Sequence, residues 1–296
     1  MIGPVIGYRR ADGGPRIRRE EQVVWQGGWA AIGLFDARPD DPHFRCSGAP
    51  GEHLFVFPCT SVRIERDGED VFVADRNLVT FYEPDQAYTR SPVSPRGDRG
   101  HWFAIAPAVL EELLHGAGRR QRGRRLLPFA AGPGDLESYR RQGLLVQRLM
   151  AGEPVTDLVV EEAVLALAHR VLRGARRQSA GRLEPTAGQD SLVRRARHLL
   201  AERWMEAEPL AAIAAALGCS PYHLCRVFRA VTGTSLQAHR EQLRLRRALL
   251  EIPRRRGDLA ALALELGYSS HSHFTAAFRR AVGVPPSRWR EGLAGF

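Results

Sequence analysis

Residues 210–228 read LAAIAAALGCSPYHLCRVF, and residues 259–278 read LAALALELGYSSHSHFTAAF. The second stretch repeats the order of features of the first and begins 49 residues after it. Each predicts a short apolar helix, a turn at a glycine (Gly218 or Gly267) and a second helix opened by serine. This is the form of a helix-turn-helix, whose second helix enters the DNA major groove. The repeat makes DNA binding the first hypothesis.

Basic charge is concentrated in the same part of the chain. The 296 residues carry a formal net charge of +10, and every basic residue is arginine. From residue 190 onward 17 arginines face 9 acidic residues, a balance of +8, which leaves only +2 for the first 189 residues. This separation favours a nucleic-acid-binding module joined to a nearly neutral domain.

The four cysteines form no CxxC pair and do not indicate a disulfide framework. Cys219 and Cys225 lie inside the first repeat, where a thiol usually serves as a small apolar side chain. The N-terminus has no apolar signal core, and no run of eighteen apolar residues occurs. We therefore expect a cytoplasmic protein without a membrane partner.

The first hundred residues predict β structure. Short β-branched or aromatic runs, bounded by Gly, Pro and Asp, occur at 23–25, 30–35, 54–57, 62–65, 71–73, 78–82 and 102–105. Asp67-Gly68 predicts a hairpin turn, and residues 91–100 predict a polar loop. Seven short strands in this space favour a barrel or jelly roll.

Helical periodicity follows Pro107. Helices are predicted over 108–115, 135–150 and 157–172. Val160, Val164, Leu167 and Val171 mark one apolar face of the third, which either packs on its neighbour or forms a dimer seam. The predicted domains are a β-rich sensor-like domain (1–106), a helical segment that is a candidate for dimerisation (107–175), a Gly/Arg/Ser-rich linker (176–189) and the DNA-binding domain (190–296).

The C-terminal part contains several helix-start signals. Asp190 predicts the N-cap of a helix through Glu206, Ser220-Pro221 opens the first recognition helix, and Asp258 caps the apolar helix of the second repeat. One long helix is predicted over 235–251, between the repeats. At about 1.5 Å per residue it is roughly 25 Å long. With a helix width added, it can hold two recognition helices near the roughly 34 Å between successive major-groove openings.

The stretch from Leu210 to Trp289 resembles the DNA-binding domain of AraC/XylS-type transcription regulators. The motifs that carry the resemblance are Ala214 with Leu217-Gly218, Ser220-Pro-x-His-Leu-x-Arg-x-Phe228, Thr232-Gly-Thr-Ser235, Arg244-Leu-Arg-x-x-Ala248, Ala263-x-x-x-Gly267-Tyr, Ser272-x-Phe274, Phe278-Arg-Arg280 and Gly283-Val-x-Pro-Ser287. The resemblance implies two helix-turn-helix units bridged by a long helix, double-stranded DNA and RNA polymerase as partners, and an activator more often than a repressor.

The same resemblance implies which side chains meet DNA. Base-edge readout falls on Tyr222, Cys225, Arg226, His271, Ser272, Thr275 and Ala276. Phosphate contacts fall on Arg229, Arg279 and Arg280, for which charge on a solvated face is the alternative. Arg226 is the strongest base reader, because a guanidinium bonds guanine O6 and N7 together. Ala276 departs from relatives that have arginine there. Leu224, Phe228, Phe274, Phe278 and Trp289 are expected in the core, and His223 is expected to pack or cap.

Residues 53–106 resemble, more weakly, the β-rich sensor region of some members of this family. Phe57-Pro58, Val73-Ala-Asp75 and the stretch 83–88 carry that likeness, whereas Ser91-Pro92 and Gly100 stand where relatives often have His-Pro and a cysteine. The resemblance implies a cupin-like barrel, a small-molecule effector and a homodimer. We expect no cofactor. Strand alternation, rather than the resemblance, suggests Trp29, Phe55, Tyr82 and Trp102 as side chains that line the barrel and an effector site, with ordinary core packing as the alternative for each.

Three alternatives remain open at this point. A catalytic cupin would need an HxH with further ligands, but His43, His53 and His101 stand alone in the β-rich region, and His271-Ser-His273 lies in the second repeat. We therefore expect no enzyme and no metal site. Cys46 and Cys59, with twelve residues between them, are candidates for a redox or metal sensor that His43 or His53 would assist. A regulator that needs no ligand is the third alternative.

Overall fold

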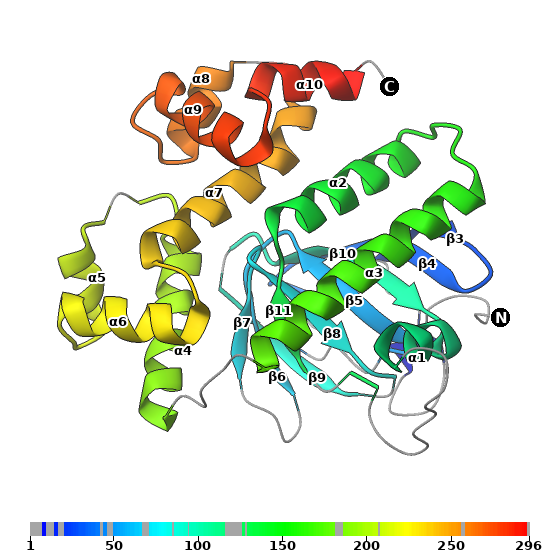
Figure 1. Cartoon of the computed structure of the whole chain (residues 1–296), viewed down its shortest axis with the longest axis horizontal. Helices are drawn as coiled ribbons and strands as arrows, with labels where there is room; N and C mark the ends of the chain where they lie inside the picture. Colours follow the sequence, from blue (N-terminus) through cyan, green and yellow to red (C-terminus); the bar gives the residue numbers. More distant parts are fainter. Residues whose placement is uncertain are drawn as a thin grey trace. The chain divides into compact units, whose positions relative to one another are not determined.

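The computed structural model describes residues 8–9, 15–16, 21–41, 44–45, 50–66, 71–84, 86–93, 95–115, 126–127, 129–180, 186–206, 208–255 and 258–294. The chain divides into two compact units, Met1–Gly181 and Arg182–Phe296 (Figure 1). Within the described residues, all strands lie in the first unit and the second is helical. This arrangement confirms the predicted α+β fold class.

The first unit is built from antiparallel strands. They are β1 (Tyr8–Arg9), β2 (Pro15–Arg16), β3 (Glu21–Gln26), β4 (Ala30–Ala37), β5 (His53–Pro58), β6 (Val62–Arg66), β7 (Phe72–Ala74), β8 (Leu78–Tyr82), β9 (Tyr88–Pro92), β10 (Asp98–Ile105) and β11 (Ala131–Pro133). The main sheet has the order β11-β8-β5-β10-β4-β3, and a second sheet has the order β7-β6-β9. The strands that the structure describes therefore do not close the predicted barrel.

An apolar core joins the two sheets. Strand β6 alternates buried and exposed residues, and its inward side chains Val62 and Ile64 pack with Leu54, Val56 and Trp102 of the main sheet. This alternation follows from the pleat, which sends successive side chains to opposite faces. The other face of the main sheet carries Phe55, Phe57 and Phe103, which form a second aromatic cluster.

All seven predicted strands are present, but the polar loop predicted at 91–100 is wrong at both ends. Ser91 and Pro92 belong to β9, and residues 98–100 begin β10. Arg90 and Asp98 are both buried and form an ion pair at 2.9 Å. Because these inward side chains are charged, the sequence lacks the apolar alternation that would predict strands there. The predicted turn at Asp67-Gly68 lies outside the described residues, as do His43 and Cys46.

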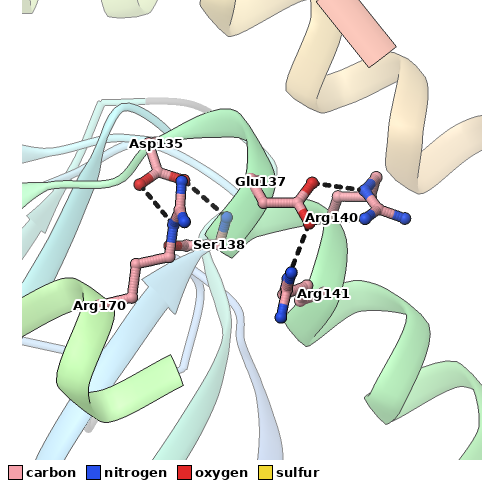
Figure 2. A network of polar contacts seen from close by, with 6 residues as sticks. All are labelled: Asp135, Glu137, Ser138, Arg140, Arg141 and Arg170. Atoms are coloured by element: carbon pink, nitrogen blue, oxygen red, sulfur yellow. Dashed lines mark hydrogen bonds and ion pairs between the residues drawn. The ribbon is translucent and has the colours of Figure 1, made fainter. Parts of the chain in front are cut away.

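Among its described residues, the first unit also contains three helices: α1 (Pro107–His115), α2 (Leu136–Met150) and α3 (Asp157–Ala180). Asp135 caps α2 by accepting from the Ser138 N–H at 2.7 Å. The same carboxylate accepts from Arg170 Nε of α3 at 2.8 and 3.1 Å, which ties the two helices together (Figure 2). Glu137 in the same turn accepts from Arg140 and Arg141.

Helix α3 is longer than the sequence pattern predicts. It continues past Leu172 to Ala180, so the predicted linker at 176–189 begins inside a helix. The stripe Val160, Val164, Leu167 and Val171 is at most 2% exposed. The stripe therefore packs within the unit, where α3 contacts α2 and β11, and it is not available as a dimer seam.

The second unit contains α4 (Ala187–Glu202), α5 (Leu210–Ala216), α6 (Pro221–Thr232), α7 (Leu236–Glu251), the 3₁₀ turn η1 (Ile252–Arg254), α8 (Leu259–Glu265), α9 (His271–Val282) and α10 (Pro286–Ala294). Asp190 is not the N-cap of α4. Thr186 and Gln189 form a reciprocal capping box there, with the Thr186 hydroxyl accepting from Gln189 N–H and the Gln189 side chain from Thr186 N–H. Helix α4 ends at Glu202 rather than at Glu206.

Among the described residues, no single helix has the length and apolar composition of a membrane span. The pair α5 and α6 meets that composition only as two segments bent by 85°.

Candidate nucleic-acid interface

Both recognition helices begin with a serine cap. The Ser220 hydroxyl accepts from the His223 N–H at 3.2 Å at the start of α6, and Pro221 occupies the first turn. The Ser270 hydroxyl accepts from the His273 N–H at 3.1 Å at the start of α9. Asp258 caps α8 by accepting from the Ala260 N–H at 2.6 Å. These contacts confirm the caps predicted at Ser220 and Asp258, and they fix where each recognition helix starts.

A left-handed glycine makes the turn before each recognition helix. Gly218 has φ +69° and Gly267 has φ +77°, a region that other residues enter only with strain. The two sites differ in their surroundings. A Cβ on Gly267 would lie 2.2 Å from the Met205 carbonyl oxygen, whereas a Cβ on Gly218 would meet no described atom within 4 Å. The second turn is therefore packed against the rest of the unit, and the first is open.

One face of α6 forms the core and the opposite face is exposed. Leu224, Val227 and Phe228 are at most 1% exposed. On the other face Tyr222 is 78% exposed, and Cys225, Arg226 and Arg229 are also exposed. His223 is exposed, so its main-chain N–H takes part in the cap while its ring does not pack in the core.

Helix α9 has the same division. Phe274, Ala277 and Phe278 are buried, which confirms the predicted core positions of the two phenylalanines. The residues predicted to meet DNA that are exposed on α9 are His271, Ser272, Ala276, Arg279 and Arg280. Thr275 is half-buried, and its hydroxyl lies 3.4 Å from His271 Nε2. The structure thus places the predicted DNA-contacting side chains on the faces of α6 and α9 that are not used for packing.

Arg244 of the bridging helix α7 contacts both the segment after α4 and the second helix-turn-helix unit. Its guanidinium donates to the carbonyls of Trp204 at 3.0 Å, Met205 at 3.3 Å and Glu206 at 3.4 Å, and it lies 5.6 Å from the Tyr268 ring. Burial lowers the pKa of Arg244, an effect that the neighbouring Arg240 reinforces. In the sequence Arg244 belongs to a family motif, but the motif alone indicates no role for it. Its role is to hold the segment after α4 against the second repeat.

The first unit encloses a small cavity between its sheets. The cavity is about 20 Å³, and Thr80, Tyr82, Arg90, Asp98 and Trp102 are among its lining residues. That volume holds about one water molecule. Burial, reinforced by the neighbouring Tyr88, raises the pKa of Tyr82 well above its ordinary value, so the phenol is neutral.

Only half of the suggested effector residues reach this cavity. Tyr82 and Trp102 line it. Phe55 lies between Leu54 and Val56, which do line it, so the pleat directs Phe55 to the opposite face, where it stacks on Phe103 at 5.0 Å. Trp29 precedes β4 and is not a lining residue. Sequence reasoning missed the buried Arg90–Asp98 pair, because charged residues in a β-rich segment predict solvent exposure.

Comparisons with known proteins identify the C-terminal unit. A family model described as a helix-turn-helix domain matches residues 213–292. Regulatory protein SoxS of Salmonella typhimurium strain LT2 is 36% identical over 76 residues, which cover 26% of this chain and 71% of that protein. The chain belongs to the AraC/XylS family of transcription regulators.

Two further similarities cover different parts of the chain. The arabinose operon regulatory protein of the same organism is 28% identical over 104 residues, 35% of this chain and only 37% of that protein's length. The crystal structure of ToxT from Vibrio cholerae, bound to an unsaturated fatty acid, covers 95% of this chain and 99% of that chain at 11% identity and a TM-score of 0.38. A structural likeness of this size carries no inference about a ligand of this chain.

Proposed function

We propose that this protein regulates transcription by binding double-stranded DNA with both helix-turn-helix units, under the control of its N-terminal unit. The observation that carries the proposal is the duplicated pair of recognition helices, each capped by serine and each with an exposed polar face. Membership in the AraC/XylS family supports the same function. Action on DNA would place the protein in the cytoplasm, and RNA polymerase is the partner that this family membership suggests.

We infer an unequal division of labour between the recognition helices. In the first, Arg226 would read a guanine bidentately, with Tyr222 and Cys225 beside it. In the second, Ala276 has no hydrogen-bonding side chain, so His271, Ser272 and Thr275 would carry any base readout. Arg229, Arg279 and Arg280 are exposed and would contact phosphates, which position the protein without reading sequence.

The bridging helix supports simultaneous binding of two grooves. Helix α7 has 16 residues and is about 24 Å long at about 1.5 Å per residue. The first repeat packs on this helix through α6, and α9 of the second repeat contacts α10, which packs on the turn η1 that continues the helix. One chain would therefore cover two adjacent major grooves on one face of the duplex.

We also propose that the first unit binds a small-molecule effector at its cavity. The proposal rests on Trp102, whose indole N–H is buried at the cavity without a hydrogen-bond partner among the described residues. An effector with an acceptor atom would satisfy this donor, and Tyr82 and Arg90 lie on the same cavity. Because the cavity holds only about one water molecule, the two sheets would have to separate to admit an effector.

A homodimer remains a proposal as well. The Val160 stripe is buried within the unit, so a dimer through α3 would use the opposite face of that helix. On that face Leu158 is 66% exposed and Leu165 is 41% exposed.

Selection from random DNA tests the proposed function. The full-length protein is incubated with duplexes that contain about 30 randomised base pairs, and bound molecules are sequenced over several rounds. We expect an enriched site with two blocks about 10–10.5 base pairs apart. As a control, the selection is repeated with Arg173→Ala, which removes an exposed arginine of α3 in the first unit. This variant should enrich the same site as the unmodified protein. A library that stays random through all rounds would refute the proposal.

A further inference from the structure

Four segments converge on Cys59, directly after β5. The Cys59 N–H donates to the Arg99 carbonyl of β10 at 2.7 Å, and the Cys59 carbonyl accepts from Arg76 Nε at 2.8 Å. Helix α2 covers the same place, since the Tyr139 hydroxyl donates to the Pro58 carbonyl at 2.9 Å. The main chain of Cys59 is therefore fixed on both sides. The residue remains partly exposed, whereas Arg76 is 3% exposed.

His101 is the basic side chain that the strand pairing brings nearest to this thiol, because it lies opposite Phe57 of β5, two residues before Cys59. It is 6% exposed and lies on β10, two residues beyond the Arg99 carbonyl that holds Cys59. Its Nδ1 lies 2.6 Å from Gln142 Oε1. The Gln142 amide nitrogen donates to the Tyr139 carbonyl at 3.0 Å, so its oxygen faces the histidine as an acceptor. His101 Nδ1 must then carry a proton, which leaves Nε2 as the acceptor of the neutral ring.

The surroundings favour the thiolate form of Cys59. Burial raises the pKa of the thiol, but the charge of His101 and its hydrogen bond to the sulfur lower it more, together with the charge of Arg76. The resulting pKa is about 7, compared with an ordinary value of 9.0. Asp75, which accepts from the Asn77 N–H at 2.7 Å, and Arg96 are the other charged groups near Arg76.

We propose that Cys59 and His101 form a thiolate site that peroxides oxidise. His101 Nε2 accepts the thiol proton, and the thiolate attacks one peroxide oxygen, forming the S–O bond as the O–O bond breaks. The displaced hydroxide, or alkoxide from an organic peroxide, takes the proton from the imidazolium and leaves as water or alcohol. Cys59 is oxidised by two electrons to sulfenic acid, and the peroxide is reduced by two.

The position of the sulfur gives this oxidation a structural consequence. Tyr139 and Gln142, both on α2, contact the groups that flank the thiol. An added oxygen on Cys59 must therefore change the packing between α2 and the end of β5. Cys219 and Cys225 lie in the second unit and serve as controls within the same chain.

The first experiment measures the alkylation of each cysteine in the full-length protein. Iodoacetamide is applied over about pH 5 to pH 10, and each cysteine is quantified by peptide mass spectrometry. We expect the rate at Cys59 to rise with a midpoint near pH 7, below the midpoint of free cysteine measured under the same conditions. A Cys59 profile that matches free cysteine would overturn the proposal. This result needs no variant and no DNA, so it stands apart from the proposed function.

The second experiment tests the oxidation itself. Hydrogen peroxide is added together with dimedone, which traps sulfenic acid, and we expect the adduct at Cys59 ahead of Cys219 and Cys225. His101→Gln should raise the alkylation midpoint of Cys59 by about one unit or more and slow trapping at neutral pH severalfold, because the thiolate fraction falls. The control is His169→Gln, an exposed position on α3. Absence of the adduct from Cys59 in the wild-type protein would contradict the proposal.

Discussion

Arg244 donates from Nε to the main-chain carbonyl of Trp204, 40 residues earlier in the chain, at 3.0 Å. The bridging helix thereby holds the end of the α4 region, and the same guanidinium lies over the Tyr268 ring in the second repeat. The Tyr268 hydroxyl in turn donates to Glu241 of α7 at 3.0 Å. Arg244, Tyr268 and Glu241 thus join the segment after α4, the bridging helix and the second repeat.

Arg244→Ala should destabilise the second unit by about 2–3 kcal/mol, because it removes a buried charged donor from the Trp204 carbonyl and two further part-buried hydrogen bonds. Arg240→Ala is the matched control on the same helix. Arg240 is half-exposed and donates to Glu206 and Glu208 carbonyls at 3.3 and 3.1 Å, so its loss should cost about 1 kcal/mol or less. Urea unfolding followed by circular dichroism gives both values. Equal losses in the two variants would contradict the role assigned to Arg244.

The two turn glycines should respond differently to alanine. Gly218→Ala meets only the strain of a left-handed residue, about 1 kcal/mol. Gly267→Ala adds a collision with the Met205 carbonyl, so we expect a total loss of about 3 kcal/mol or more. Thermal unfolding of the two variants side by side measures the difference. The packing described around Gly267 is wrong if Gly218→Ala proves the more harmful change.

Acid should weaken the first unit through Glu137. Hydrogen bonds from Arg140, more than those from Arg141, lower the pKa of Glu137 from its ordinary 4.5 to about 2 (Figure 2). A lowered folded-state pKa stabilises the fold above about pH 4.5, and that contribution is lost as the pH falls toward 2. Because the side chain is 32% exposed, we expect a loss of only about 1 kcal/mol.

The check on Glu137 is a comparison with Glu137→Gln. Urea midpoints are measured between about pH 5 and pH 2 for both proteins. The wild-type advantage should shrink steadily through this window, since the glutamine has no carboxylate to protonate. A constant difference between the two proteins would show that Glu137 is not the titrating group.

Local patterns in the sequence predict much of the second unit. The serine caps, the turn glycines and the buried phenylalanines are all consequences of helix geometry over a few residues, and they appear where the repeat places them. The N-cap of α4 can also be predicted from the sequence. Thr186-Ala-Gly-Gln189 has the threonine and glutamine of a capping box, a stronger signal than the lone Asp190.

Long-range pairing explains what the sequence does not reveal in the first unit. Strand β9 carries a buried arginine whose partner, Asp98, lies on another strand, so no apolar alternation marks it. The prediction that Phe55 lines the cavity is wrong. Its neighbours Leu54 and Val56 line it instead, because side chains one residue apart on a strand point to opposite faces. Cys59 and His101 are 42 positions apart, and only the pairing of β5 with β10 brings their segments together.

Removing Arg280 should affect DNA binding in a different way from removing Arg226. If Arg280 contacts phosphate, Arg280→Ala weakens binding to all sequences alike and lowers the slope of log affinity against log salt by about one unit. Affinities measured at several salt concentrations on two unrelated duplexes test this prediction. A loss confined to one of the duplexes would make Arg280 a base reader instead.

The most direct test of the central claim is the affinity of wild-type protein and Arg226→Ala for duplexes that differ at one base pair at a time across the selected site. If Arg226 reads a guanine, the variant loses about 1–3 kcal/mol on the best site and no longer discriminates at one position, while its other base preferences persist. If the variant binds every duplex more weakly by the same factor and keeps all its preferences, Arg226 contacts the backbone and the proposed readout is wrong.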